Sequence, residues 1–149
     1  MTLAQSNDLQ IGKLELIACQ SNTCELVDRY DTTSGLPGWQ APTDISARAK
    51  GPIPNPEAVK RKSYFLTTKP IDSRGVKGID GNFYSITPET VHLPDKTRSG
   101  FGIHADKNVP GTAGCLGVTN DSDWKRFQAQ FVKITKLGID KIPLVITYN

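Results

Sequence analysis

The sequence has no long hydrophobic run. No apolar stretch approaches the roughly 20 residues that a membrane-spanning helix requires. The first twenty residues also lack the charged segment followed by an apolar stretch that marks a signal peptide. We therefore expect no membrane insertion and no visible export signal.

The chain also has little net charge. The formal net charge is only +3, and the lysines and arginines are scattered, with the densest cluster at residues 60–62. A nucleic-acid-binding surface usually shows a more concentrated basic patch. We therefore expect no nucleic-acid partner, whereas this charge is compatible with an acidic polymer such as a bacterial wall.

Cysteine and histidine are few, which argues against a metal site. A zinc deaminase combines His-x-Glu with a later Pro-Cys-x-x-Cys, whereas His104 is followed by Asp106 and no cysteine follows Cys115. Cys19 and Cys24 flank a four-residue polar tip, where they could pair or remain reduced. We expect no metal and no cofactor, and the oligomeric state stays open.

The size and composition fit one globular domain spanning residues 1–149. A hydrophobic fraction of 37% with 22% charged residues is typical of a folded rather than a disordered chain. Ten prolines and thirteen glycines imply many turns. The expected fold class is therefore mainly β, a β-rich α+β domain.

Hydrophobic patterns predict short strands and one helix. Alternating residues predict an N-terminal hairpin over 13–18 and 24–30, and the turn formers in 32–56 predict a long surface connection. Further β-prone runs lie at 64–67, 83–86, 101–104 and 144–148, the last with Pro143 at its start.

The helix is predicted to begin after Asp121 and Ser122, which suit an N-cap, and to stop at Gly138. Its apolar stripe consists of Trp124, Phe127, Phe131, Ile134 and Leu137. This helical spacing favours core packing over a ligand platform.

The segment 99–118 brackets one histidine and one cysteine with glycines. If Phe101 and Ile103 point into the core, His104 points to the opposite face and emerges from a strand end rather than being buried. The loop that follows contains a Pro-Gly turn, which would let Cys115 approach His104. A thiol becomes a useful nucleophile when an imidazole accepts its proton.

Neighbouring residues supply two further candidate roles. Gly114 lets the backbone approach a carbonyl, so the amides around it and Cys115 could form an oxyanion hole. Asp106 could orient His104 as the third member of a triad, or could cap the loop by accepting backbone N–H bonds.

The chain resembles the L,D-transpeptidase catalytic domain family, also called the YkuD fold, in which a histidine precedes a Ser/Thr-x-Gly-Cys motif. Here the motif is Thr112-Ala113-Gly114-Cys115, followed by a final strand containing residues 142–146; a weaker likeness extends to Ser34-Gly35 and to residues 51–54. The resemblance implies a β-sandwich or barrel with one helix after the catalytic cysteine. It also implies a peptidoglycan stem peptide as substrate, attacked at an L-centre that precedes a D-residue.

Two departures from the family pattern are visible. Ala113 stands where the family usually has a second histidine, and His104 lies closer to Cys115 than is usual. This shorter form is similar to a divergent His-x-Asp branch that includes wall-attacking toxins and phage-type proteins. His104 is then the sole candidate base, and the outcome is open between cross-linking, carboxypeptidase and endopeptidase activity.

Other residues carry weaker hypotheses. Arg98 is a candidate ligand for a substrate carboxylate, although an exposed arginine near a turn is commonly just solvated. Thr112 of the motif is a second substrate-binding candidate. His92 is expected in a loop or at a sheet edge. Cys115 itself has a simpler interpretation as a small buried residue in a tight turn.

Three functional hypotheses follow. The first is an enzyme in which Cys115 forms a thioester with a stem peptide, resolved by water or by an amine. The second is a non-catalytic wall-binding or virion structural module of the same fold, and the third is a general cysteine peptidase. Because the wall lies outside the cytoplasm, the first hypothesis requires delivery by a phage, by a secretion machine, or through an export signal since removed.

Overall fold

The computed structural model describes residues 9–107 and 110–148. Its main sheet has the strand order β1-β2-β9-β8-β5-β3-β10, with β4 paired to β5, and β6 pairs separately with β7. The strands are β1 (Gly12–Gln20), β2 (Thr23–Thr33), β3 (Tyr64–Thr67), β4 (Ile71–Ser73), β5 (Gly81–Thr87), β6 (Thr90–His92), β7 (Thr97–Ser99), β8 (Gly102–Ala105), β9 (Leu116–Val118) and β10 (Lys141–Leu144).

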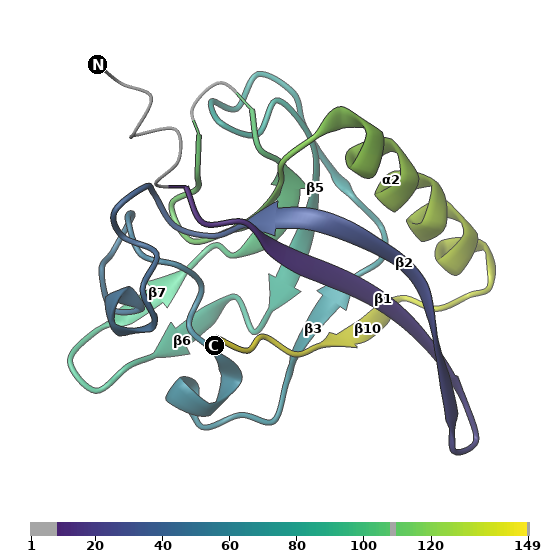
Figure 1. The fold of residues 1–149 in the computed structure, drawn as a ribbon, viewed down its shortest axis with the longest axis horizontal. Helices are drawn as coiled ribbons and strands as arrows, with labels where there is room; N and C mark the ends of the chain where they lie inside the picture. Colours follow the sequence, from purple (N-terminus) through teal and green to yellow (C-terminus); the bar gives the residue numbers. More distant parts are fainter. Residues whose placement is uncertain (1–8, 108–109, 149) are drawn as a thin grey trace.

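The protein is mainly β, as the composition predicts. The main sheet curls, and α2 (Asp121–Lys136) lies along one side of it (Figure 1). Two short 3-10 helices, η1 (Pro42–Asp44) and η2 (Pro56–Val59), lie in the connection between β2 and β3. Within the described ranges, no helix combines the length and the hydrophobicity needed to cross a bilayer.

Helix α2 covers an aromatic core. Trp124, Phe127 and Phe131 are buried, and their rings lie 5.1–5.9 Å from that of Tyr84 on β5. The predicted apolar stripe is therefore correct for these three residues. It is wrong for Leu137, which is 75% exposed because it caps the helix after Lys136 and no longer faces the sheet.

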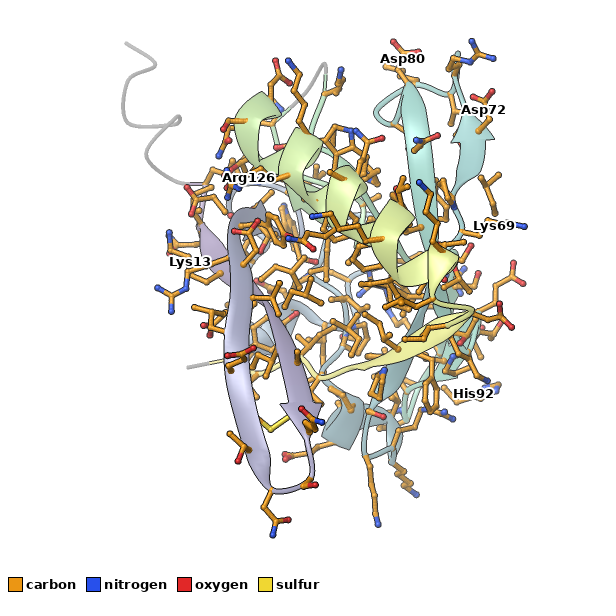
Figure 2. All side chains as sticks on the ribbon, turned by 90° about the vertical axis from the view of Figure 1, so that its right-hand side faces the viewer. Lys13, Lys69, Asp72, Asp80, His92 and Arg126 are labelled. Carbon is orange, nitrogen blue, oxygen red and sulfur yellow. A yellow bond between two sulfur atoms is a disulfide. The ribbon has the colours of Figure 1, made fainter. Side chains whose placement is uncertain are left out.

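Helix α2 begins at Asp121, two residues earlier than predicted. Asn120 is the N-cap, and its side chain accepts a hydrogen bond of 2.8 Å from the amide of Asp123. Asp123 in turn accepts a bond from the amide of Asp31 on β2 at 2.6 Å. Arg126, labelled in Figure 2, pairs with Asp28 and so adds a second link from α2 to β2.

The predicted N-terminal hairpin is confirmed. Strands β1 and β2 pair antiparallel, and the hairpin extends beyond the rest of the fold (Figure 1). Cys19 and Cys24 face each other next to its tip and form a disulfide with a Cα–Cα distance of 4.1 Å. The pairing that the sequence left open is therefore present.

The connection from 34 to 56 differs from its prediction as a surface segment. Residues 51–54 are buried, and Ile53 is completely inaccessible. The buried side chain of Arg98 donates hydrogen bonds to the backbone carbonyls of Gly51 and Pro52, so this turn-rich segment packs against the interior.

The last strand was also placed wrongly. It runs over Lys141–Leu144, and residues 145–148 continue without strand pairing. Pro143 lies within the strand rather than before it, which is tolerated because β10 is at the edge of the sheet. The short strand β9, which pairs parallel with β8, was missed.

Candidate active site

The parallel pairing of β8 and β9 brings the segments that carry His104 and Cys115 side by side. They pair in parallel, with Ile103 opposite Leu116 and His104 opposite Gly117. Cys115 directly precedes β9, and extending this register by one residue places it opposite Gly102, two residues before His104. The thiol of Cys115 accordingly lies near the backbone of residues 100 and 102.

Two glycines, Gly102 on β8 and Gly117 on β9, lie next to the segments of His104 and Cys115. A Cβ atom on Gly102 would lie only 2.2 Å from the ring of Phe83. A Cβ atom on Gly117 would lie 3.0 Å from side-chain atoms of both Asp106 and Thr112. The glycines thus permit the close packing of these side chains around the pair.

The histidine is more deeply buried than predicted. Its side chain does point to the face opposite Ile103, but only 5% of the residue is exposed. The ring of Phe83, from the neighbouring strand β5, stacks on the imidazole with a centroid distance of 6.2 Å and an interplanar angle of 20°. The expectation that His104 emerges into solvent is therefore wrong.

The imidazole has a defined tautomer. Nδ1 of His104 lies 2.7 Å from the carbonyl oxygen of Ala105, and since a carbonyl only accepts, Nδ1 carries the hydrogen. Nε2 then has the free lone pair. Burial lowers the pKa of His104 and the Ala105 carbonyl partly opposes this shift, so the ring is a neutral base at pH 7.

Cys115 is a half-buried thiol. Its Sγ donates to the carbonyl oxygen of Gly100 at 3.6 Å, and in residues 9–107 and 110–148 no hydrogen bond joins Sγ to the imidazole. Burial raises the pKa of Cys115 to about 11, against opposing effects of the Gly102 amide and Arg98. In this arrangement the thiol is protonated at neutral pH and is bonded to the backbone rather than to His104.

Asp106 contacts the loop rather than the histidine. Its Oδ2 accepts a hydrogen bond of 3.1 Å from the amide of Gly111, whereas its Oδ1 is buried and has no hydrogen-bond partner among residues 9–107 and 110–148. Burial raises the pKa of Asp106, and the Gly111 amide opposes that rise. Of the two roles considered for Asp106, this geometry corresponds to the loop cap.

Three consecutive carbonyl groups around the thiol are each held by a different side chain. The carbonyl of Ala113 accepts from Arg98 at 3.3 Å, that of Gly114 from the hydroxyl of Ser34 at 3.2 Å, and that of Cys115 from the hydroxyl of Thr112 at 2.5 Å. The Thr112 hydroxyl also accepts from the amide of Gly114 at 3.3 Å. The backbone of the Thr-x-Gly-Cys motif is therefore tightly constrained.

The two predicted substrate ligands, Arg98 and Thr112, are both part of this hydrogen-bond network. Arg98 is only 4% exposed, so the alternative that it is solvated is wrong. All four of its Nη hydrogens are used by the backbone carbonyls of Ile45, Gly51, Pro52 and Ala113. To bind a substrate carboxylate, Arg98 would have to break some of these hydrogen bonds. Thr112 is likewise buried and bonded within the motif.

Sequence reasoning missed Ser34 and Phe83 as parts of this site. Ser34 appeared only as a turn former and as a weak family likeness, and its hydrogen bond to Gly114 spans 80 residues. Phe83 was placed on a strand without a partner. His92, as expected, lies at an edge: it is exposed on β6, and Figure 2 shows it on the outside of the fold.

The two cavities described in the structure do not contain the pair. One, of about 400 Å³, is polar and lies between α2, the β4–β5 hairpin and residues Ala105 and Lys107. The other, of about 930 Å³, is a groove between β1 and residues 144–148 that reaches Leu116.

A metal centre has no support in this geometry. In the part of the chain that the structure describes, no three residues among His, Cys, Asp and Glu gather into a possible ligand group. Comparison with protein-family models, with curated proteins and with solved structures finds no significant match.

Proposed function

We propose that this protein is a cysteine-dependent acyl-transfer enzyme acting on peptidoglycan stem peptides, as its resemblance to the L,D-transpeptidase family implies. The observation that carries the proposal is the parallel pairing of β8 with β9, which sets Cys115 beside the strand of His104, with the histidine held in the tautomer that a general base requires. Phe83 packs over Gly102, and Asp106 and Thr112 pack over Gly117, so the surroundings of the pair are filled by side chains.

In the first half of the reaction, Sγ of Cys115 gives its proton to Nε2 of His104 while sulfur bonds to the carbonyl carbon of the substrate. The carbonyl oxygen becomes an anion, which backbone N–H groups next to the thiol stabilise. When the C=O bond re-forms, the C–N bond breaks and the departing amine takes the proton from Nε2. The acyl group remains on Cys115 as a thioester.

In the second half, His104 is again neutral and removes a proton from a water molecule or an amine that attacks the thioester. The C–S bond breaks, and sulfur recovers the proton from Nε2. Water gives a carboxypeptidase or endopeptidase, and an amine gives a new cross-link. Because the pKa of the resting thiol is raised to about 11, the first half depends on proton transfer from Sγ to His104.

Mass spectrometry of purified muropeptides incubated with the protein tests this function. We expect a lost terminal residue, a broken cross-link or a new dimer with the wild type, and no change with Cys115→Ala or His104→Ala. His92→Ala is the matched control, because His92 is exposed and lies outside the site. Unchanged muropeptide profiles with the wild type would contradict the proposal.

A second candidate is a non-catalytic wall-binding or virion structural module. The specific observation in its favour is the resting thiol, which is bonded to the Gly100 carbonyl rather than to the imidazole. It predicts that the wild type and Cys115→Ala bind peptidoglycan sacculi equally and that neither alters the muropeptides. Any product that depends on Cys115 eliminates this candidate.

A further inference from the structure

We infer that Ser34 is a positioning residue that aims the backbone amide of Cys115 at the oxyanion formed during the reaction. The inference rests on the proposed function and adds to it a residue from a distant part of the chain. Ser34 is half-buried, lies directly after β2, and its hydroxyl donates to the carbonyl of Gly114 at 3.2 Å.

The link from Ser34 to the Cys115 amide follows from peptide geometry. The carbonyl of Gly114 and the N–H of Cys115 belong to one planar trans peptide, in which the two groups point in opposite directions. By holding the carbonyl, Ser34 sets the direction of the N–H. The amide of Gly114 is already bonded to Thr112, so the Cys115 amide is the better donor for a developing anion.

Ser34 is itself rigidly held. Its Oγ accepts a hydrogen bond of 2.9 Å from the amide of Ile53, which leaves the hydroxyl hydrogen for Gly114. Ile53 is completely buried, and its carbonyl accepts a bond from the hydroxyl of Tyr148. The orientation of the Gly114–Cys115 peptide is thus fixed by contacts that reach the core.

Gly114 makes this arrangement possible. Its φ of +126° lies in a region that side-chain-bearing residues rarely adopt, and a Cβ atom there would lie 2.6 Å from the guanidinium of Arg98. Its carbonyl can therefore turn toward Ser34 while its amide bonds to Thr112.

The test is steady-state kinetics of Ser34→Ala on a stem-peptide substrate. Because a misdirected oxyanion donor acts on the transition state, we expect kcat to fall roughly 10- to 100-fold while KM changes less than about 3-fold. Thr33→Val is the matched control: it removes the hydroxyl of the preceding residue, which donates to the carbonyl of Gln10 and accepts from the side chain of Gln40 but has no contact with the Gly114–Cys115 peptide. We expect this control to keep kcat within about 3-fold of the wild type.

An isosteric pair separates the hydroxyl from packing effects. Ser34→Thr and Ser34→Val have the same shape, and only threonine keeps the donor, so threonine should retain kcat and valine should lose it. An unchanged kcat in Ser34→Ala, an effect on KM alone, or equal losses in Ser34→Thr and Ser34→Val would overturn the inference.

Amide NMR keeps this inference separate from the proposed function. Loss of the Ser34 hydroxyl should shift the amide signals of Gly114 and Cys115 whether or not the protein turns over a wall substrate. An inactive wild type would contradict the proposed function alone. Unshifted amide signals in Ser34→Ala would overturn the inference even if the wild type is active.

Discussion

His104 donates its Nδ1 hydrogen to the carbonyl oxygen of Ala105, the residue that follows it, over 2.7 Å. A backbone atom therefore orients the imidazole, a task that a carboxylate performs in many triads. Asp106 is only two residues away, yet its carboxylate is turned to the amide of Gly111. The two roles considered for Asp106 can be distinguished by a single substitution.

Asp106→Asn should leave catalysis nearly intact. The amide oxygen of asparagine can still accept from Gly111, and His104 keeps its Ala105 carbonyl, so we expect kcat within about 3-fold of the wild type. Loss of a true triad aspartate costs roughly 10⁴-fold. A fall of that size in a folded Asp106→Asn variant would restore Asp106 to the triad.

The same variant should be more stable than the wild type at pH 7. Because burial raises the pKa of Asp106, the folded state favours its protonated form, and this contribution to stability, present below the unfolded pKa of 3.8, is lost as pH rises through the folded pKa. Asparagine is neutral at every pH. Thermal unfolding at pH 4 and pH 7 should show the gain mainly at pH 7; equal gains would contradict this explanation.

Activity should depend on pH through His104. Its pKa is lowered below 6.5 by burial, so the neutral base persists at pH 7 and kcat/KM should fall only below about pH 6.5. The thiol pKa of about 11 predicts no second transition between pH 7 and pH 9. A bell-shaped profile with a descending limb near pH 8 would indicate a thiolate–imidazolium pair instead.

Stability should also depend on pH through His104, on the same acid side as activity. A depressed histidine pKa contributes stability that is complete above pH 6.5 and is lost as pH falls through the folded pKa. The free energy of unfolding of His104→Gln, measured in urea, should therefore change less between pH 6.5 and pH 4 than that of the wild type. Equal changes in the two proteins would show that another group is responsible.

Arg98→Lys should act on folding rather than on substrate affinity. One ammonium group lacks the planar fork that reaches four carbonyls, so buried acceptors lose their partners and the free energy of unfolding should fall by at least about 3 kcal/mol. Lys60→Ala is a surface control. A raised KM with an unchanged unfolding midpoint would instead support Arg98 as the carboxylate ligand.

Gly102→Ala should disturb the stacking of Phe83 on His104. The added methyl group would lie within 2.7 Å of three atoms of the Phe83 ring, an overlap that costs about 1–3 kcal/mol of stability. Combining it with Phe83→Leu should recover part of this loss because leucine leaves more room. Additive losses in the double variant would show that the two residues do not compete for the same space.

The sequence predicts the parts of this fold that depend on local pattern. The hairpin, β3, the aromatic stripe of α2 and the face of His104 follow from periodicity alone. The parallel pairing of β8 with β9 does not, because β9 is only three residues long and its register is set by contacts on both sides. Burial of His104 likewise depends on Phe83, which belongs to a different strand.

In the candidate site, too, local sequence pattern predicts some features and long-range contacts determine the others. The motif around Cys115 predicts the candidate reactive segment, whereas two of the side chains that hold its carbonyls come from elsewhere in the chain. Ser34 is 80 residues from its partner, and Arg98 binds carbonyls up to 53 residues away. Such contacts leave no periodic signal, so an arginine expected at the surface is found in the interior.

Trapping of the acyl-enzyme tests the central claim most directly. Intact-protein mass spectrometry after rapid acid quenching of a mixture with a stem tetrapeptide should show the mass of one acyl group added to the wild type. Peptide mapping should locate this group on Cys115, and Cys115→Ala should show no addition. Turnover without any adduct on Cys115, or an adduct that persists in Cys115→Ala, would contradict a nucleophilic role for this cysteine.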